Sequence, residues 1–99
     1  MNGLNLNLKE QKVLVSGAST GLGAYVCKAF SAAGADIGIQ YNNSSENAIV
    51  LEQELRKNGK AFTLKANLKD PESTRLLFKE AVDELNEVSI LVNCAATGS

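Results

Sequence analysis

The chain has 99 residues and a mass of 10.5 kDa, which is enough for one domain built around a single hydrophobic core. Ten basic and eleven acidic residues give a formal net charge of −1, and their even spread argues against nucleic-acid or anionic-membrane partners. No apolar run approaches the roughly 20 residues of a membrane span, and residues 1–8 are too polar for a signal peptide. We therefore expect a cytoplasmic protein that binds a small molecule.

The two cysteines form no recognisable metal or disulfide pattern. Cys27 and Cys94 lie far apart in the sequence, the chain has no C-x-x-C motif, and histidine is absent. A zinc site or a disulfide framework is therefore not predicted, and we expect both cysteines to be buried thiols.

The segment 12–23 joins an apolar run to a helix through spaced glycines. Val13-Leu14-Val15 is short and β-branched enough for a buried strand, and apolar residues then recur at helical spacing until Gly34. The inner face of this helix is expected to carry Leu22, Val26, Ala29, Phe30 and Ala33. The turn between strand and helix contains Gly17, Gly21 and Gly23.

A strand joined to a helix in this way can bind a phosphate, because the helix presents unpaired N–H groups and the positive end of its dipole. By analogy with the dinucleotide fingerprint, Gly17 makes the tight turn, Gly21 lets the backbone approach a diphosphate, and Gly23 lets helix and sheet pack closely. The spacing G-x-x-x-G-x-G lacks the Lys-Ser/Thr ending of a P-loop, so kinase or ATPase chemistry is not expected. The alternative is a glycine-rich turn that binds no ligand.

Three more strands alternate with two more helices along the rest of the chain. Alternating apolar residues predict strands at 35–41, 61–67 and 88–93. Regular alternation of strands and helices predicts parallel strands joined by right-handed crossovers, with helices on both faces of the sheet. We therefore expect residues 1–99 to form half of a doubly wound α/β fold with four strands in the order 3-2-1-4 and three helices. Its fourth strand would leave an open edge, which favours a homo-oligomer.

Local signals mark the ends of the two later helices. Ser44 or Ser45 can cap the first of them, and Gly59 ends it. Its inner face is expected to carry Ala48, Leu51 and Leu55. Asp70-Pro71-Glu72 begins the second helix with an N-cap, a first-turn proline and an acidic residue. Its inner face is expected to carry Phe78, Ala81, Val82 and Leu85.

Three short segments, in order along the chain, resemble the motifs of the short-chain dehydrogenase/reductase family. They are residues 16–23 after the first strand, Asn67-Leu68 after the third and residues 91–96 after the fourth. The resemblance covers the whole chain and is greatest for the 3-oxoacyl-acyl-carrier-protein reductases. It implies a Rossmann fold, a nicotinamide dinucleotide as the cofactor and an oxidoreductase as the parent activity.

The resemblance also implies which residues would contact the cofactor. The diphosphate and the adenosine ribose would lie against Gly17, Ser19, Thr20, Gly21, Leu22 and Gly23. Asn67 and Leu68 would hold the adenine, and Asn93 with Ala95 would form the floor on the ribose side. Four positions depart from the usual Thr, Asp, Asn and Gly of the family, namely Ser16, Asn67, Cys94 and Ala96. Asn67 and Asn93 could instead cap the ends of strands.

The end of the second predicted strand bears on the choice between NADP and NAD. An acidic residue there favours NAD through the ribose 2′-OH, whereas a nearby cation favours NADP. This chain has Tyr41-Asn42 at that place and polar residues at 43–45, so hydrogen-bond donors and no repelling acid would face a 2′-phosphate. No Lys or Arg occurs between Lys28 and Arg56, so NADP is expected without an ionic partner, with NAD as the alternative. Tyr41 could also be a packing aromatic.

The resemblance implies that reduction needs a serine, an asparagine and a tyrosine–lysine pair spaced Y-x-x-x-K. Neither Tyr25 nor Tyr41 has a lysine four residues on, so no catalytic residue is assigned, and this chain alone is not expected to turn over a substrate. Three hypotheses stay open: the cofactor-binding part of an NADP-dependent reductase, an isolated nucleotide-binding module, and a self-associating structural half-fold. A flavodoxin-like or receiver fold is disfavoured, because its acids or extra hydroxyls are missing after the first and third strands.

Overall fold

The computed structural model describes residues 7–18 and 21–94, in which strands and helices alternate as predicted. The helices are α1 (Gly21–Ala32), α2 (Ser45–Leu55) and α3 (Pro71–Leu85). The strands are β1 (Lys12–Ser16), β2 (Asp36–Tyr41), β3 (Ala61–Lys65) and β4 (Ile90–Asn93). Within these residues, no helix is both long and apolar enough to cross a membrane.

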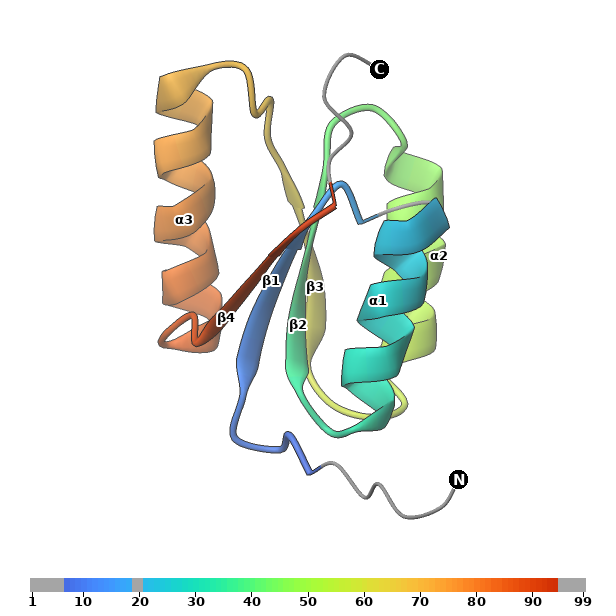
Figure 1. Ribbon diagram of the computed structural model, residues 1–99. Coiled ribbons are helices and arrows are strands. Elements are labelled where there is room, and N and C mark those ends of the chain that lie inside the picture. The colour runs from blue at the N-terminus through green and yellow to red at the C-terminus, as the bar shows by residue number, and fades with distance from the viewer. Residues whose placement is uncertain (1–6, 19–20, 95–99) are drawn as a thin grey trace.

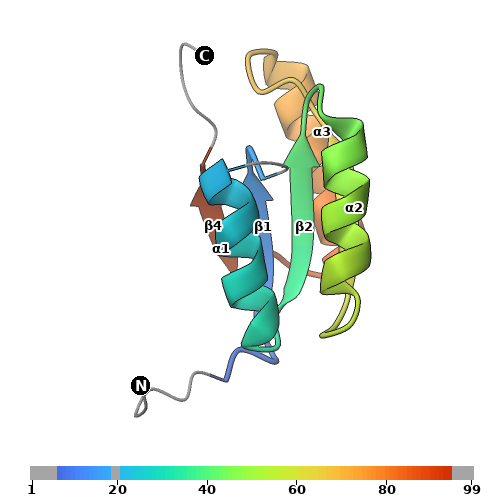
Figure 2. The same cartoon turned by 90° about the vertical axis from the view of Figure 1, so that its right-hand side faces the viewer.

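The strands form one parallel sheet in the order β3-β2-β1-β4, which confirms the predicted topology (Figure 1). In the centre of the sheet, Val15 of β1 lies in register with Ile39 of β2 and with Val92 of β4. Helices α1 and α2 cover one face of the sheet and α3 covers the other, as Figures 1 and 2 show. This division follows from right-handed crossovers that run in opposite directions from the centre of the sheet.

The hydrophobic core is divided between the two faces of the sheet, because successive strand residues point to opposite sides. On the side of α1 and α2, buried strand residues include Val13, Val15, Ile37 and Ile39. On the side of α3 they are Leu14, Phe62 and Leu64.

The prediction of two buried thiols is half confirmed. Cys27 is fully buried, and burial raises the pKa of its thiol to about 12, whereas Cys94 follows the edge strand β4 and is only partly buried.

The predicted inner face is confirmed for α2 and wrong in part for the other two helices. In α2 the buried residues are Ala48, Leu51 and Leu55, as predicted. In α1 they are Gly23, Cys27 and Ser31, while Leu22 is 70% exposed. In α3 they are Leu77, Ala81 and Leu85, while Phe78 and Val82 are 38% and 43% exposed. Small residues let α1 approach the sheet closely, and a hydrophobicity pattern does not mark glycine and serine as inward-facing.

The predicted helix boundaries have identifiable causes in the structure. Asp70 caps α3, because its Oδ1 accepts a hydrogen bond of 3.2 Å from the backbone N–H of Glu72. After α1 ends, Gly34 has φ of 104°, a conformation that L residues with a Cβ rarely adopt. Ser44 precedes α2 as predicted, but its side chain makes no capping hydrogen bond.

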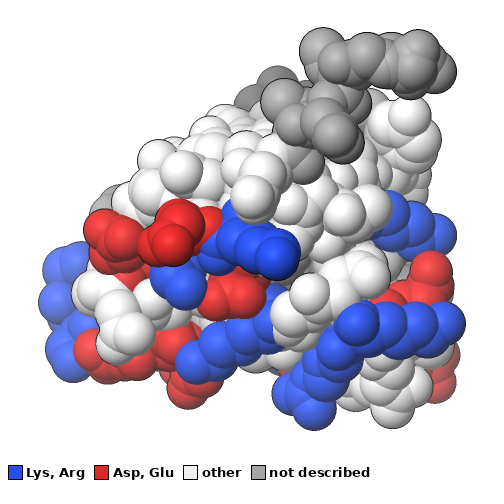
Figure 3. Space-filling model, turned by 90° about the horizontal axis from the view of Figure 1, so that it is seen from below, with Lys and Arg blue, Asp and Glu red and all other residues white. Residues whose placement is uncertain are grey.

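Basic and acidic side chains are interspersed at the lower end of the molecule (Figure 3). Among them, Lys12 Nζ lies 2.7 Å from Asp36 Oδ2, and the other carboxylate oxygen of Asp36 accepts a hydrogen bond of 3.1 Å from the backbone N–H of Lys60. Burial by itself raises the pKa of Asp36, but the hydrogen bonds from Lys12 and Lys60 outweigh it and hold the pKa below 3.8.

This ion pair makes stability depend on pH in the acid range. Because the pKa of Asp36 is lower in the folded than in the unfolded chain, its contribution is complete above the unfolded value and disappears as the pH falls through the folded value. The wild type is expected to exceed Asp36→Asn by up to about 1 kcal/mol in unfolding free energy at neutral pH. Urea unfolding of both proteins from pH 7 to acid should show the gap closing. A gap independent of pH would contradict a role for the carboxylate charge.

Candidate functional site

The carboxyl ends of β1 and β4 meet at one edge of the sheet. Ser16 and Asn93, the last residues of the two strands, lie in register, and Ser16 Oγ donates a hydrogen bond of 2.8 Å to Asn93 Oδ1. The backbone N–H of Cys94 also donates to the carbonyl of Ser16 at 3.0 Å. The first and third segments of the family resemblance are therefore adjacent, as the predicted sheet order requires.

The glycines after β1 shape the connection to α1. Gly17 has φ of 64° and Gly21 has φ of 58°, so both adopt the left-handed conformation that makes a sharp turn possible. A Cβ on Gly23 would lie 2.2 Å from the carbonyl oxygen of Gly17 and 2.7 Å from the Cα of Ala18. Only glycine therefore fits at position 23, and this contact holds the first turn of α1 against the end of β1.

Gly21 differs from Gly23 because its surroundings are open. Apart from its chain neighbours and its own helix backbone, a Cβ built on Gly21 would meet no atom of the described residues within 4 Å, although its positive φ would still strain any other residue. The first amides of α1 begin here, and helical geometry leaves them without intrahelical acceptors. Together with the positive end of the helix dipole, these amides could donate hydrogen bonds to a phosphate in the open space beside Gly21.

Gln40 is a site residue that the sequence analysis missed. Its side chain is 2% exposed, its Oε1 accepts a hydrogen bond of 2.6 Å from the N–H of Gly17, and its Nε2 donates one of 2.8 Å to the carbonyl of Ala66. Its backbone carbonyl accepts the N–H of Ala18 at 3.0 Å. The amides of Gly17 and Ala18 are thus already paired, so among the described residues the donors that could bond a phosphate lie further on, in the first turn of α1.

The segment after β3 forms a tight turn of its own. Asn67 Oδ1 accepts the backbone N–H of Lys69 at 3.0 Å, and the N–H of Asn67 donates to Ser73 Oγ at 2.9 Å. Asn67 therefore caps the turn after β3, which is the alternative role considered for it. Its side chain is also exposed, and the second lone pair of its oxygen could still accept a hydrogen bond from a ligand. Leu68 is partly buried and packs against the core on the side of α3.

The end of β2 lies beside a cation that the linear sequence did not reveal. Tyr41 is partly buried against the core of α1 and α2, as its alternative packing role requires, and Asn42 is exposed. Lys65, the last residue of β3, lies in register with Tyr41 and is exposed. A lysine from the neighbouring strand thus accompanies the strand end at which the sequence analysis found no charged residue.

The structure brings several predicted site residues to one edge of the sheet. The ends of β1, β2 and β4 carry Gly17, Tyr41 and Asn93, and α1 begins beside them with Gly21 and the exposed side chain of Leu22. The remaining predicted residues of the glycine turn and of the segment after β4 lie outside the described residues; they are Ser19, Thr20 and Ala95.

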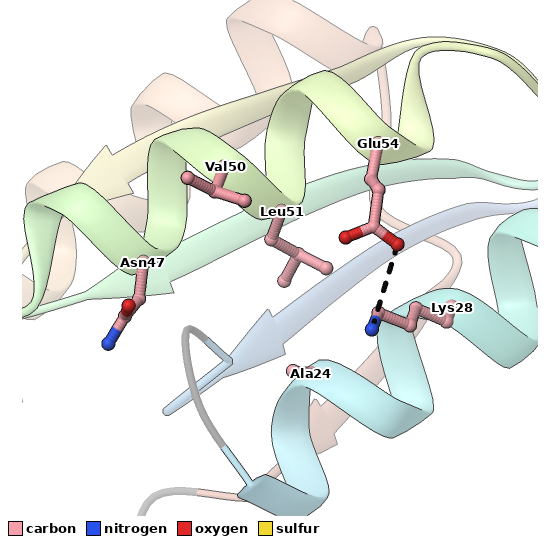
Figure 4. A pocket seen from close by; sticks show the side chains of 6 residues that line it. All are labelled: Ala24, Lys28, Asn47, Val50, Leu51 and Glu54. Carbon is pink, nitrogen blue, oxygen red and sulfur yellow. Dashed lines mark ion pairs between the residues drawn. The ribbon is translucent and has the colours of Figure 1, made fainter.

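A shallow groove with a volume of about 200 Å³ runs between α1 and α2 (Figure 4). Lys28 Nζ and Glu54 Oε2 lie 3.6 Å apart across it, and both side chains are about half exposed. Its lining residues come from the two helices and include none of the predicted site residues, so the groove is separate from the glycine turn.

Comparison with known proteins agrees with this geometry. A family profile described as short chain dehydrogenase matches residues 11–99. An uncharacterized oxidoreductase of Mycobacterium tuberculosis is 37% identical over 87% of this chain, and a 3-oxoacyl-acyl-carrier-protein reductase of Staphylococcus aureus is 29% identical over 86% of it. The chain spans about a third of these relatives, 33% and 35% of their lengths.

Solved structures show the same arrangement of strands and helices. A short-chain dehydrogenase from Burkholderia cenocepacia, crystallised in complex with NADP, is 30% identical and superposes with a TM-score of 0.89. The match covers 94% of this chain and 38% of that one. The glycine turn, the parallel sheet and the family match lead to one assignment: this chain belongs to the short-chain dehydrogenase/reductase family and corresponds to the N-terminal portion of its members.

Proposed function

We propose that this chain binds NADP(H) and forms the cofactor-binding part of an oxidoreductase. The observation that carries the proposal is the open space beside Gly21, bordered by the first turn of α1 at the carboxyl edge of the sheet. In doubly wound folds, ligands bind at this edge where the strand order reverses, here between β1 and β4. A diphosphate would receive hydrogen bonds from the first amides of α1.

The proposal of NADP over NAD rests on the surroundings of Tyr41. Residues 42–45, directly after β2, include no acid that would repel a 2′-phosphate, and Lys65 lies in register with Tyr41 on the adjacent strand. A lysine side chain at this place could reach an anion bound beside Asn42 and provide a charge-assisted hydrogen bond. The NADP complex of the Burkholderia cenocepacia relative is in line with this choice.

The Gly21→Ala variant tests where the diphosphate binds. The added Cβ would occupy the open space beside the first turn of α1, so the Kd for NADP should rise at least tenfold, or about 1.4 kcal/mol. Calorimetric titration of the wild type and the variant measures this effect. Gly59→Ala is the control, because it makes the same change at the opposite edge of the sheet from the glycine turn. Its new Cβ would lie 3.3 Å from Asp36 Oδ1, and Asp36 is the first residue of β2.

The same titration also tests the proposal as a whole. A wild-type Kd weaker than millimolar for both NADP and NAD would exclude cofactor binding by these residues. Equal affinity of the wild type and Gly21→Ala would move the diphosphate to another place. A clear preference for NAD would contradict the role given to Lys65.

Reduction of a carbonyl requires more than the cofactor. A general acid must protonate the substrate oxygen, and the tyrosines of this sequence, Tyr25 and Tyr41, lack a lysine four residues on. We therefore propose that the site beside Gly21 binds the cofactor and that this chain alone does not turn over a substrate. The substrate is assigned by analogy only: a 3-oxoacyl group is the substrate named for the Staphylococcus aureus relative.

Self-association through β4 is the second part of the proposal. Among the described residues, β4 pairs only with β1, and Leu91 on β4 is 53% exposed. Parallel or antiparallel pairing of two β4 edges would satisfy the backbone groups of both and cover this leucine. Sedimentation should show a dimer that Leu91→Lys abolishes, whereas Leu76→Lys, at a 43% exposed position on α3, should leave it intact. A wild-type monomer at high concentration would refute the dimer.

A further inference from the structure

Gln40 is a buried amide in an otherwise apolar part of β2. It lies between Ile39 and Tyr41 on a strand that has neighbours on both sides, so water cannot satisfy its polar atoms. Instead its oxygen pairs with the N–H of Gly17 and its nitrogen with the carbonyl of Ala66. One side chain therefore connects the turn after β1 to the residue that follows β3.

This bridge needs an amide of this length. Gly17 offers a donor and Ala66 offers an acceptor, so the bridging group must accept at one end and donate at the other. A carboxylate lacks the donor, a lysine lacks the acceptor and a leucine of similar size lacks both. The same two partners fix the orientation of the amide, because turning it around would place its NH₂ group against the N–H of Gly17.

We propose that Gln40 is a positioning residue that sets the separation between the glycine turn and the segment after β3. The inference rests on the proposed function, in which the diphosphate lies by the turn, and on the place beside Asn67 that the family resemblance implies for the adenine. A fixed distance between these two places strengthens the binding of a ligand that contacts both, because the protein backbone then loses less conformational entropy on binding. Gln40 acts through the backbone, with no contact to the ligand.

The inference differs from a purely structural role in one measurable way. If Gln40 only stabilises the fold, its loss should raise the Kd of a whole ligand and of a fragment by the same factor. If it sets the separation, its loss should weaken the binding of NADP much more than that of adenosine 2′-monophosphate, which lacks the diphosphate and so depends less on the distance between the two places. Independently of any ligand, the Gly17 amide should lose protection from hydrogen exchange, because its acceptor has gone.

The experiment compares Gln40→Leu and Gln40→Glu with Gln53→Leu, which makes the same change at an exposed position of α2. Calorimetry gives the Kd of NADP and of adenosine 2′-monophosphate, and NMR gives amide exchange at Gly17 and, as an internal reference, at Leu14 in the sheet. In Gln40→Leu we expect a tenfold or greater rise in the Kd of NADP, a change below threefold for the fragment, and at least tenfold faster exchange at Gly17 relative to Leu14. Gln40→Glu keeps an acceptor for Gly17 and should retain more of its protection than Gln40→Leu. Gln53→Leu should match the wild type.

The two proposals can fail separately. Unchanged protection of Gly17 in Gln40→Leu would overturn the positioning role, whatever the wild type binds. An equal rise in the Kd of NADP and of adenosine 2′-monophosphate would overturn the positioning role as well. A wild type that binds neither NADP nor NAD would instead refute the proposed function, and the loss of Gly17 protection would still support Gln40 as the residue that holds the turn.

Discussion

Replacing Gly23 by alanine is expected to lower the free energy of unfolding by about 3 kcal/mol or more and to abolish NADP binding. The new Cβ would lie 2.2 Å from the carbonyl oxygen of Gly17 and 2.7 Å from the Cα of Ala18. Both atoms belong to the backbone, so no side-chain rotation can relieve the overlap. Either α1 must move away from the sheet or the turn after β1 must change shape, and both movements disturb the proposed diphosphate site.

Gly21→Ala is the matched control, because it makes the same chemical change two residues away. Its Cβ would meet no neighbour within 4 Å in the part of the chain that the structure describes, so the expected loss of stability is only the strain of a positive φ, about 1 kcal/mol. Urea unfolding followed by circular dichroism measures both variants against the wild type. Similar losses in the two variants would mean that α1 does not pack against Gly17 as closely as the structure indicates.

The sequence was sufficient for the parts of the fold that depend on local pattern. Alternating strands and helices and the cap at Asp70 follow from short-range signals, and the order β3-β2-β1-β4 is the usual one for half of a doubly wound fold. The inner faces of α1 and α3 were harder to predict. In α3 the apolar residues at 76, 77 and 78 are consecutive, so the sequence offers more than one apolar face, and packing against the sheet selects Leu77.

The candidate site was predictable where its residues follow a motif, and unpredictable where they depend on strand register. The glycine turn was visible in the sequence because each glycine has a local reason. Gln40 and Lys65 became visible only once the sheet was assembled, because their importance comes from Gly17, Ala66 and Tyr41, which belong to other strands or follow them. A polar residue in the middle of an apolar strand, as Gln40 is, was the one signal available beforehand, since such a buried group requires partners.

Two substitutions at neighbouring positions can test which face of α3 packs against the sheet. Leu77 is 2% exposed and packs with Leu14 and Phe62 in the core on that side of the sheet, so Leu77→Ala should lower the free energy of unfolding by about 3 kcal/mol. Phe78 is 38% exposed, and Phe78→Ala should cost about 1 kcal/mol or less, although it removes a larger side chain. Urea unfolding of the two variants decides between the faces. A larger loss for Phe78→Ala would show that α3 is turned so that Phe78, as expected from the sequence pattern, faces the sheet in place of Leu77.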